Sequence, residues 1–170
     1  ESLIEFSENG YLNASLNEII KRCNISKGGM YKYISNKTDL FEYILTTIID
    51  NIIENIPSLL EDKLINQLKK YAKWEFNYYK KNPEVKKLLN RIVLNPSCDE
   101  EKNSLELIIK ISEKFIGNIF TTKNLESSQI NSILWILEGF NKIHFNENTT
   151  EEEFFKQIEP YFEIIKKIII

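Results

Sequence analysis

Five side chains between residues 27 and 37 have the chemistry to bind a phosphate backbone. They are the ammonium groups of Lys27, Lys32 and Lys37 and the phenolic hydroxyls of Tyr31 and Tyr33. From residue 15 to residue 37 the sequence has five Lys or Arg against one Glu, a net charge of +4. Because the whole chain carries −3, the remainder sums to −7. A local basic patch on an acidic protein is typical of contact with nucleic acid at one end.

Two glycines, Gly28 and Gly29, stand among these residues. Inside a helix each costs about 1 kcal/mol relative to Ala. A helix that had only to pack within its own chain would not favour them. Glycine lets a backbone come close to another large surface, and the pair therefore indicates such an approach.

The elements that must position these residues are two short helices joined by a tight turn. Ser15 is a good N-cap for the first helix, and Glu18, three residues later, completes a capping box. An apolar face then follows at helical spacing, formed by Leu16, Ile19, Ile20 and Cys23. We expect Cys23 to be a small core residue.

The turn and the second helix are predicted from the next three residues. Asn24 tolerates the left-handed conformation that ends a helix, and Ile25 is expected to pack into the core. Ser26 is the N-cap of a second helix of about two turns. The N-termini at Ser26 and Asn36 offer free N–H groups to anions. This composition indicates a helix-turn-helix whose second helix enters a major groove.

The run Ser-Lys-Gly-x-x-Tyr-x-Tyr from Ser26, followed by Lys-x-Asp-Leu from Lys37, resembles the DNA-binding signature of the TetR family of bacterial transcriptional regulators. Two positions depart from the usual pattern. Asn24 stands where the family usually has Gly, and Ile34 where it usually has Phe. Both keep the required physics, a left-handed cap and an apolar core residue. The motif covers about the first quarter of the chain, and the rest is similar only as a succession of helices.

The resemblance implies a homodimer in which residues 27–33 of each protomer enter a major groove of a palindromic double-stranded DNA operator. Lys27, Gly28 and Gly29 would then face base edges. The full set of expected DNA-binding residues is Ser15, Ser26, Lys27, Gly28, Gly29, Tyr31, Lys32, Tyr33 and Lys37. The chain begins at Glu1, and the family implies a few further residues upstream, often basic ones.

Apolar periodicity predicts an all-α protein, with further helices over residues 36–55, 61–81, 83–94, 99–120, 128–145 and 150–170. The resemblance to the TetR family implies that residues 1–40 form the helix-turn-helix domain and residues 41–170 a ligand-binding and dimerisation bundle. The helix over residues 36–55 is about 30 Å long, enough to link two domains. Its expected apolar face is Leu40, Ile44, Ile48, Ile52 and Ile56, and its second half should join the core of the second domain.

A carboxylate among aromatic rings is the candidate site for a small-molecule effector. Glu75 lies between Tyr71, Trp74 and Tyr78, and this set could bind a cationic ligand by charge and cation–π contact. In the alternative interpretation Glu75 faces solvent and the rings belong to the core.

The last two predicted helices are apolar on more than one side and must therefore be buried on more than one side. We expect the second burial to be against another copy of the chain, through Ile133, Leu137, Phe140, Ile158, Phe162 and Ile165. Alternatively, both helices form the centre of a monomeric bundle. Gly139 would permit close helix approach, and Pro160 should kink or split the last helix.

Other function classes find little support in the residues. We expect no enzyme, cofactor or metal site, because neither a catalytic motif nor a ligand-spaced partner for His144 occurs. No apolar run reaches membrane-spanning length, and no signal peptide is visible, so we expect a cytoplasmic protein. The sequence thus predicts a ligand-responsive regulator, most simply a repressor. The alternative is a helical small-molecule-binding protein whose helix-turn-helix no longer reads DNA.

Overall fold

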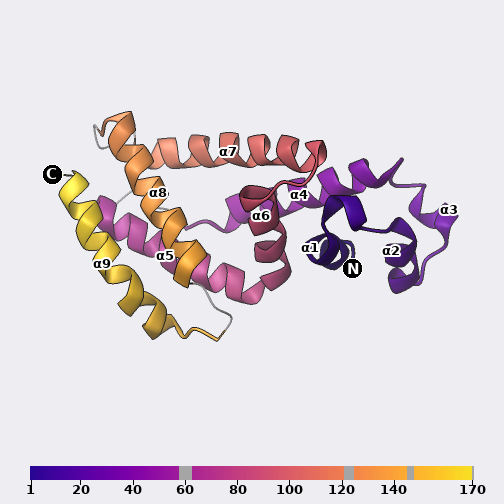
Figure 1. The fold of residues 1–170 in the computed structure, drawn as a ribbon, viewed down its shortest axis with the longest axis horizontal. Helices are drawn as coiled ribbons and strands as arrows, with labels where there is room; N and C mark the ends of the chain where they lie inside the picture. Colours follow the sequence, from indigo (N-terminus) through magenta and orange to yellow (C-terminus); the bar gives the residue numbers. More distant parts are fainter. Residues whose placement is uncertain (58–62, 121–124, 145–147, 170) are drawn as a thin grey trace. The chain divides into compact units, whose positions relative to one another are not determined.

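The computed structural model describes residues 1–57, 63–120, 125–144 and 148–169. Side chains are not described for residues 110–120, 131, 134, 135, 138 and 140–144. Throughout the described chain the elements are helices and no strand is found, which confirms the all-α prediction (Figure 1). The helices are α1 Ser2–Asn13, α2 Leu16–Cys23, α3 Lys27–Met30, α4 Lys37–Asn55, α5 Leu64–Lys81, α6 Pro83–Leu94, α7 Asp99–Phe120, α8 Ser127–His144 and α9 Glu151–Ile169.

The chain divides into two compact units, which do not follow the order of the sequence. The first comprises residues 1–55 and 82–112, and the second comprises residues 56–81 and 113–170. The functional boundary predicted after residue 40 is a separate matter and stays a prediction. However, α4 belongs to the first unit along its whole length, with Ile48 and Ile49 buried. The first unit includes residues 82–112 of the predicted second domain, so the expectation that the second half of α4 joins that domain's core stays a prediction.

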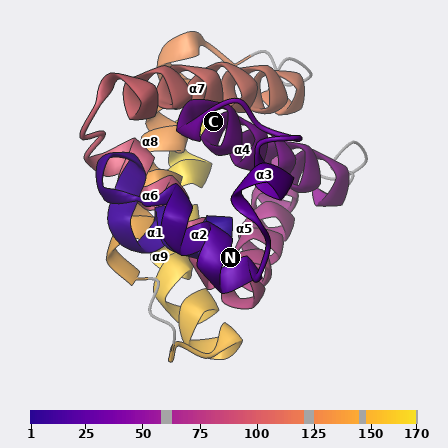
Figure 2. The same ribbon diagram turned by 90° about the vertical axis from the view of Figure 1, so that its right-hand side faces the viewer.

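In the first unit, α1 packs against α4 and α6 (Figure 2). Phe6 and Tyr11 of α1 meet Phe41 of α4, with ring centroids 5.0 Å and 5.2 Å from that of Phe41. Gly10 has a φ of 71° and interrupts α1, but the helix resumes and continues to Asn13.

The buried face of α4 differs from the predicted one. Leu40 and Ile48 are buried as expected, whereas Ile44 and Ile52 are only half-buried. The remaining buried positions are Phe41, Leu45 and Ile49. A strict four-residue spacing advances by slightly more than one helical turn at each step, so it drifts away from a fixed face. Mixed three- and four-residue steps follow the face of a straight helix better.

In the second unit, α9 packs against α5 and α8. The core lies between these helices and contains Leu64, Leu68, Ala72, Phe76, Ile133, Phe154, Ile158, Phe162 and Ile165. Ion pairs join α5 to α9 beside this core: Lys69 to Glu159 at 2.8 Å, and Lys73 to Glu151 at 2.6 Å. Pro160 lies inside α9, yet α9 runs as one helix and is not split there. None of the described helices is both long and apolar enough to cross a membrane.

Candidate nucleic-acid interface

The two ends of α2 have the predicted caps. The hydroxyl oxygen of Ser15 accepts a hydrogen bond from the N–H of Glu18 at 3.4 Å. Asn24 adopts the left-handed conformation, with φ 52° and ψ 43°, and its N–H donates to the carbonyls of Ile20 and Lys21. The local sequence therefore determines where this helix begins and ends.

The burial of α2 is smaller than its apolar pattern predicts. Ile19 is fully buried, but it is the only buried residue of the helix. Cys23 and Ile25, both expected in the core, are exposed. An eight-residue helix contacts the core beneath it over a short length, so residues in its last turn and beyond lie outside that contact.

The second helix, α3, is shorter than predicted. The hydroxyl oxygen of Ser26 accepts a hydrogen bond from the N–H of Gly29 at 3.0 Å, as an N-cap should. The α-helix ends at Met30, and turns follow in which the N–H groups of Tyr33 and Ile34 donate to the Met30 carbonyl. The expected recognition segment, residues 27–33, is thus one helical turn followed by a hydrogen-bonded turn.

Most residues expected to meet DNA around α3 are exposed. Lys27, Gly28, Tyr31, Lys32 and Tyr33 are all exposed, and Tyr33 is 89% exposed. Met30 is the one buried residue of α3.

The two glycines of α3 differ in what surrounds them. A Cβ atom at Gly29 would lie 3.1 Å from the hydroxyl oxygen of Ser26, so the capping contact explains that glycine in part. A Cβ atom at Gly28 would meet no atom within 4 Å. Its φ is not positive either, so neither packing nor backbone conformation within the described chain requires glycine there.

Two of the five cations in the basic patch form hydrogen bonds or ion pairs within the chain. The Lys37 ammonium, expected at a phosphate, donates to the carbonyls of Leu12 at 3.1 Å and Ala14 at 3.2 Å. It also lies 4.7 Å from the centre of the Tyr11 ring. The Arg22 guanidinium is paired with carboxylates of α1. The exposed cations that remain are Lys21, Lys27 and Lys32.

The N-terminus of α4 is closed by its own side chains. The Asn36 side-chain oxygen accepts from the N–H of Asp39 at 2.9 Å, and the Asp39 carboxylate accepts from the N–H of Ser35 at 2.9 Å. The hydrogen bond from the Ser35 backbone is the main reason that the pKa of Asp39 lies below its ordinary value. This helix end is therefore already bound by a carboxylate of the chain and is less open to an external anion than predicted.

In the second unit, the residues expected to bind a ligand lie beside the core. The core face of α5 consists of Leu64, Leu68, Ala72 and Phe76. Tyr71, Trp74 and Tyr78 are half-buried, and the Trp74 ring stacks on that of Tyr78 with centroids 5.2 Å apart. Glu75 is half-buried too. Burial, together with the charge of Glu75, raises the pKa of Tyr79. The alternative interpretation, in which Glu75 faces solvent and the rings belong to the core, does not describe this arrangement fully, and ligand binding by these residues stays a prediction.

The residues expected at the dimer interface are mostly inside one chain. Ile133, Ile158, Phe162 and Ile165 are fully buried in the core of the second unit. Side chains already covered within a protomer leave no surface for a second copy, so these four are corrected from interface to core. Leu137 is half-buried against the same core, and the side chain of Phe140 lies outside the described residues.

Residues 2–44 match the family model of the bacterial regulatory proteins of the tetR family. This segment contains α1, α2, α3 and the first turns of α4. Residues 2–44 form a TetR-family DNA-binding domain. The match covers about the first quarter of the chain, and DNA binding is assigned to this segment.

Two solved structures resemble the fold of the whole chain. A TetR family transcriptional regulator, PfmR from Thermus thermophilus, has a TM-score of 0.59 and 16% identity, with 98% of both chains covered. A TetR family transcriptional regulator from Chloroflexus aurantiacus has a TM-score of 0.50 and 16% identity, covering 98% of this chain and 85% of that one. Identity this low shows the fold alone. A comparison with curated proteins gives no match.

Sequence reasoning missed two buried carboxylates that form hydrogen bonds with the TetR-family domain. Glu5 is 2% exposed and Glu101 is fully buried. Periodicity marks apolar positions, and a glutamate in a helix is normally assigned to the surface. In the part of the chain that the structure describes, no group of three His, Cys, Asp or Glu residues could hold a metal ion.

Proposed function

We propose that the chain is a ligand-responsive repressor that acts in the cytoplasm as a homodimer on a palindromic operator. A small apolar or aromatic molecule would release it. The observation that supports this most is the surface around α3, where Lys27, Gly28, Tyr31, Lys32 and Tyr33 are exposed together. An open glycine among cations and phenols suits close approach to a phosphate backbone.

In this proposal the residues of α3 divide into two roles. Lys27, Gly28 and Gly29 face base edges in the major groove and give sequence preference. Five side chains contact phosphates and fix the register without reading sequence: Ser15, Ser26, Tyr31, Lys32 and Tyr33. Lys37 acts behind this surface by holding the end of α1.

The proposed dimer uses the side of α8 and α9 that faces away from the core. Ile164 of α9 is 49% exposed. Ser128 and Ser132 of α8 are exposed, and a Cβ atom at Gly139 would meet no atom within 4 Å. Exposed apolar side chains and small residues allow helices of two protomers to approach closely. A twofold axis would place the same patch of both protomers together and set the two α3 segments at a fixed separation.

The proposed effector site lies on α5. Glu75 follows Leu64 by eleven residues and Leu68 by seven, so it points to the same side of the helix as these core residues. The stacked rings of Trp74 and Tyr78 adjoin it. A carboxylate beside aromatic rings favours an aromatic cation as effector.

Release of the operator requires that effector and DNA weaken each other's binding by the same factor. Titration calorimetry on the free and the operator-bound protein measures both affinities. Typical couplings correspond to roughly 5- to 150-fold. Equal effector affinity in the two states would exclude effector-driven release, however tightly the effector bound.

Selection of bound sequences from random DNA tests the DNA-binding part of the proposal. We expect a palindrome with half-sites about one DNA turn, or ~34 Å, apart, and binding that weakens steeply with salt. Binding of small aromatic cations with no enriched DNA sequence would instead support the alternative, a helical small-molecule-binding protein whose helix-turn-helix does not read DNA.

A further inference from the structure

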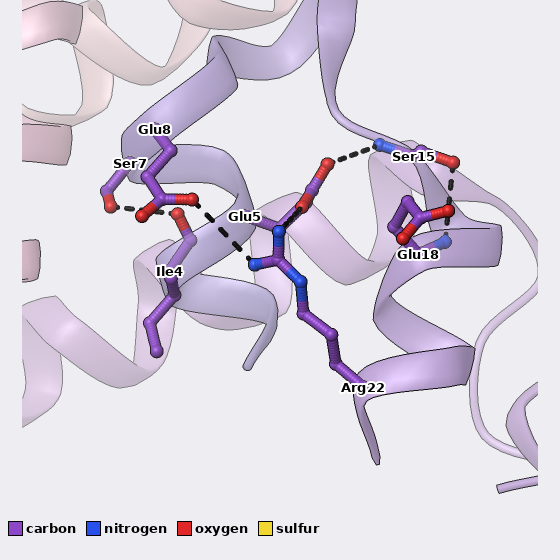
Figure 3. Close-up of polar contacts among 7 residues, drawn as sticks. All are labelled: Ile4, Glu5, Ser7, Glu8, Ser15, Glu18 and Arg22. Atoms are coloured by element: carbon purple, nitrogen blue, oxygen red, sulfur yellow. Dashed lines mark hydrogen bonds and ion pairs between the residues drawn. The ribbon is translucent and has the colours of Figure 1, made fainter. Parts of the chain in front are cut away.

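The carboxylate of Glu5, on α1, contacts both ends of α2 (Figure 3). Its Oε1 accepts a hydrogen bond from the N–H of Ser15, the N-cap of α2, at 3.0 Å. Its Oε2 lies 3.3 Å from Nη2 of Arg22, in the last turn of α2. In the capping box predicted from sequence, Glu18 would have accepted from the Ser15 N–H. Glu5 takes that place.

The polar contacts matter because α2 and α3 have little apolar attachment. Ile19 is the buried residue of α2, and Met30 that of α3. Since α3 has four residues and follows α2 after a tight turn, its orientation depends on that of α2. A helix held by one buried side chain can rotate about that contact unless its ends are fixed.

We propose that Glu5 is a positioning residue for DNA binding, which holds α2, and thereby α3, at a fixed angle to α1. Arg22 is its necessary partner and serves this contact rather than DNA. The inference rests on the proposed DNA-binding function.

The buried carboxylate of Glu5 depends on the charge of Arg22, whose own side chain is 36% exposed. Oε2 of Glu5 is buried and has no hydrogen-bond partner among the described residues, so the Arg22 charge is what compensates it. Arg22 also lies 3.8 Å from Glu8, whose side chain is 47% exposed. Loss of Arg22 would leave the buried carboxylate of Glu5 without a compensating charge, whereas a solvated carboxylate such as Glu8 contributes little to stability.

A matched pair of variants tests the position of the carboxylate. Glu5→Gln and Glu8→Gln make the same change on the same helix, near the same arginine, and differ in burial. We expect Glu5→Gln to weaken binding to the selected operator about tenfold and to leave binding to unrelated DNA within about twofold, because the phosphate contacts stay in place. Glu8→Gln should bind both DNAs like the parent. Operator affinity unchanged in Glu5→Gln would overturn the proposal.

Variants of Arg22 separate positioning from direct contact with phosphate. Arg22→Gln should weaken operator binding without changing the slope of log affinity against log salt. Arg22→Lys, which keeps the charge, should bind the operator almost as tightly as the parent. Combining Glu5→Gln with Arg22→Gln should weaken binding no further than either change alone. A slope reduced by about one unit on operator and unrelated DNA alike would make Arg22 a phosphate ligand and overturn its assigned role.

Amide hydrogen exchange gives a readout that needs no DNA. Glu5→Gln should speed exchange in α2 and leave α5 and α9 unchanged, whereas Glu8→Gln should match the parent. Unchanged amide exchange in α2 would contradict the proposal that Glu5 holds this helix in place. The parent protein could select no operator while Glu5→Gln still speeds amide exchange in α2. In that case the proposed DNA-binding function fails, but the role of Glu5 in holding α2 is supported.

Discussion

The backbone N–H of Tyr11 in α1 donates a hydrogen bond of 3.0 Å to the Glu101 carboxylate of α7, across 90 residues of sequence. Gly10, with a positive φ of 71°, interrupts α1 immediately before Tyr11, so the Tyr11 N–H is outside the helical hydrogen-bond pattern. The other oxygen of Glu101 accepts from the N–H of Ser97 at 2.7 Å and from its hydroxyl at 2.8 Å. One buried carboxylate thus joins the TetR-family domain to α7.

The charge of Glu101 should stabilise the fold above acidic pH. Burial alone would raise the pKa of Glu101, but hydrogen bonds from Ser97 and Tyr11 and the charge of Arg91 outweigh it, and the pKa lies below its ordinary value of 4.5. A depressed pKa in the folded state contributes stability above pH 4.5 that is lost as pH falls through the folded pKa.

We therefore predict that Glu101→Gln lowers the free energy of unfolding at pH 7 by about 1 kcal/mol or more, because hydrogen bonds to a charged acceptor are stronger. The difference from the parent should shrink below the ordinary glutamate pKa. Urea unfolding at pH 7 and at acidic pH measures both. Glu106→Gln, an exposed change on the same helix, is the control and should match the parent. A Glu101→Gln deficit that persists undiminished in acid would contradict the role of the charge.

Gly28→Ala should separate DNA binding from stability. The added methyl group meets no atom within 4 Å, and Ala suits a helix better than Gly by up to about 1 kcal/mol. We expect thermal unfolding at the same or a higher temperature, together with weaker operator binding, because the methyl group occupies the space between α3 and the DNA. Equal operator affinity in the variant would exclude close approach at Gly28.

Lys37→Ala should change stability but not the salt dependence of DNA binding, and Lys32→Ala should do the reverse. Removal of Lys37 takes two hydrogen bonds from the carbonyls at the end of α1, so we expect a loss of about 1 kcal/mol of stability and an unchanged salt slope. Removal of the exposed Lys32 should lower the slope by about one unit and leave unfolding unchanged. If Lys37→Ala lowers the slope and leaves stability intact, the phosphate role predicted from sequence is correct.

Some features of the fold could be predicted from the sequence because they depend on neighbouring residues. The caps at Ser15, Asn24 and Ser26 were predicted because each depends on atoms within four residues along the chain. The other bounds of the later helices were close for the same reason, since prolines and polar turns mark them, whereas the predicted start at residue 61 and the predicted ends at residues 145 and 170 lie outside the described residues.

Partners distant in sequence were out of reach. Glu5 finds Ser15 and Arg22 on the next helix, and Glu101 finds Tyr11 across 90 residues. The sequence likewise predicts an exposed cation at Lys37, because the carbonyls of Leu12 and Ala14 that its ammonium contacts are distant along the chain. Periodicity also cannot say which apolar residues of a helix face its own chain and which face a second copy.

Two neighbouring residues of α9 test that last distinction. Ile165 is fully buried and belongs to the core, whereas Ile164 is 49% exposed. Ile165→Glu should unfold the second unit, because an unpaired buried carboxylate costs about 3 kcal/mol or more. Ile164→Glu should stay folded by circular dichroism but become monomeric by ultracentrifugation at micromolar concentration, because a twofold axis brings both new carboxylates to one apolar interface. Ile164→Val, which stays apolar, should remain dimeric. A parent protein that is already monomeric would contradict the homodimer, and a dimeric Ile164→Glu protein would place its interface elsewhere.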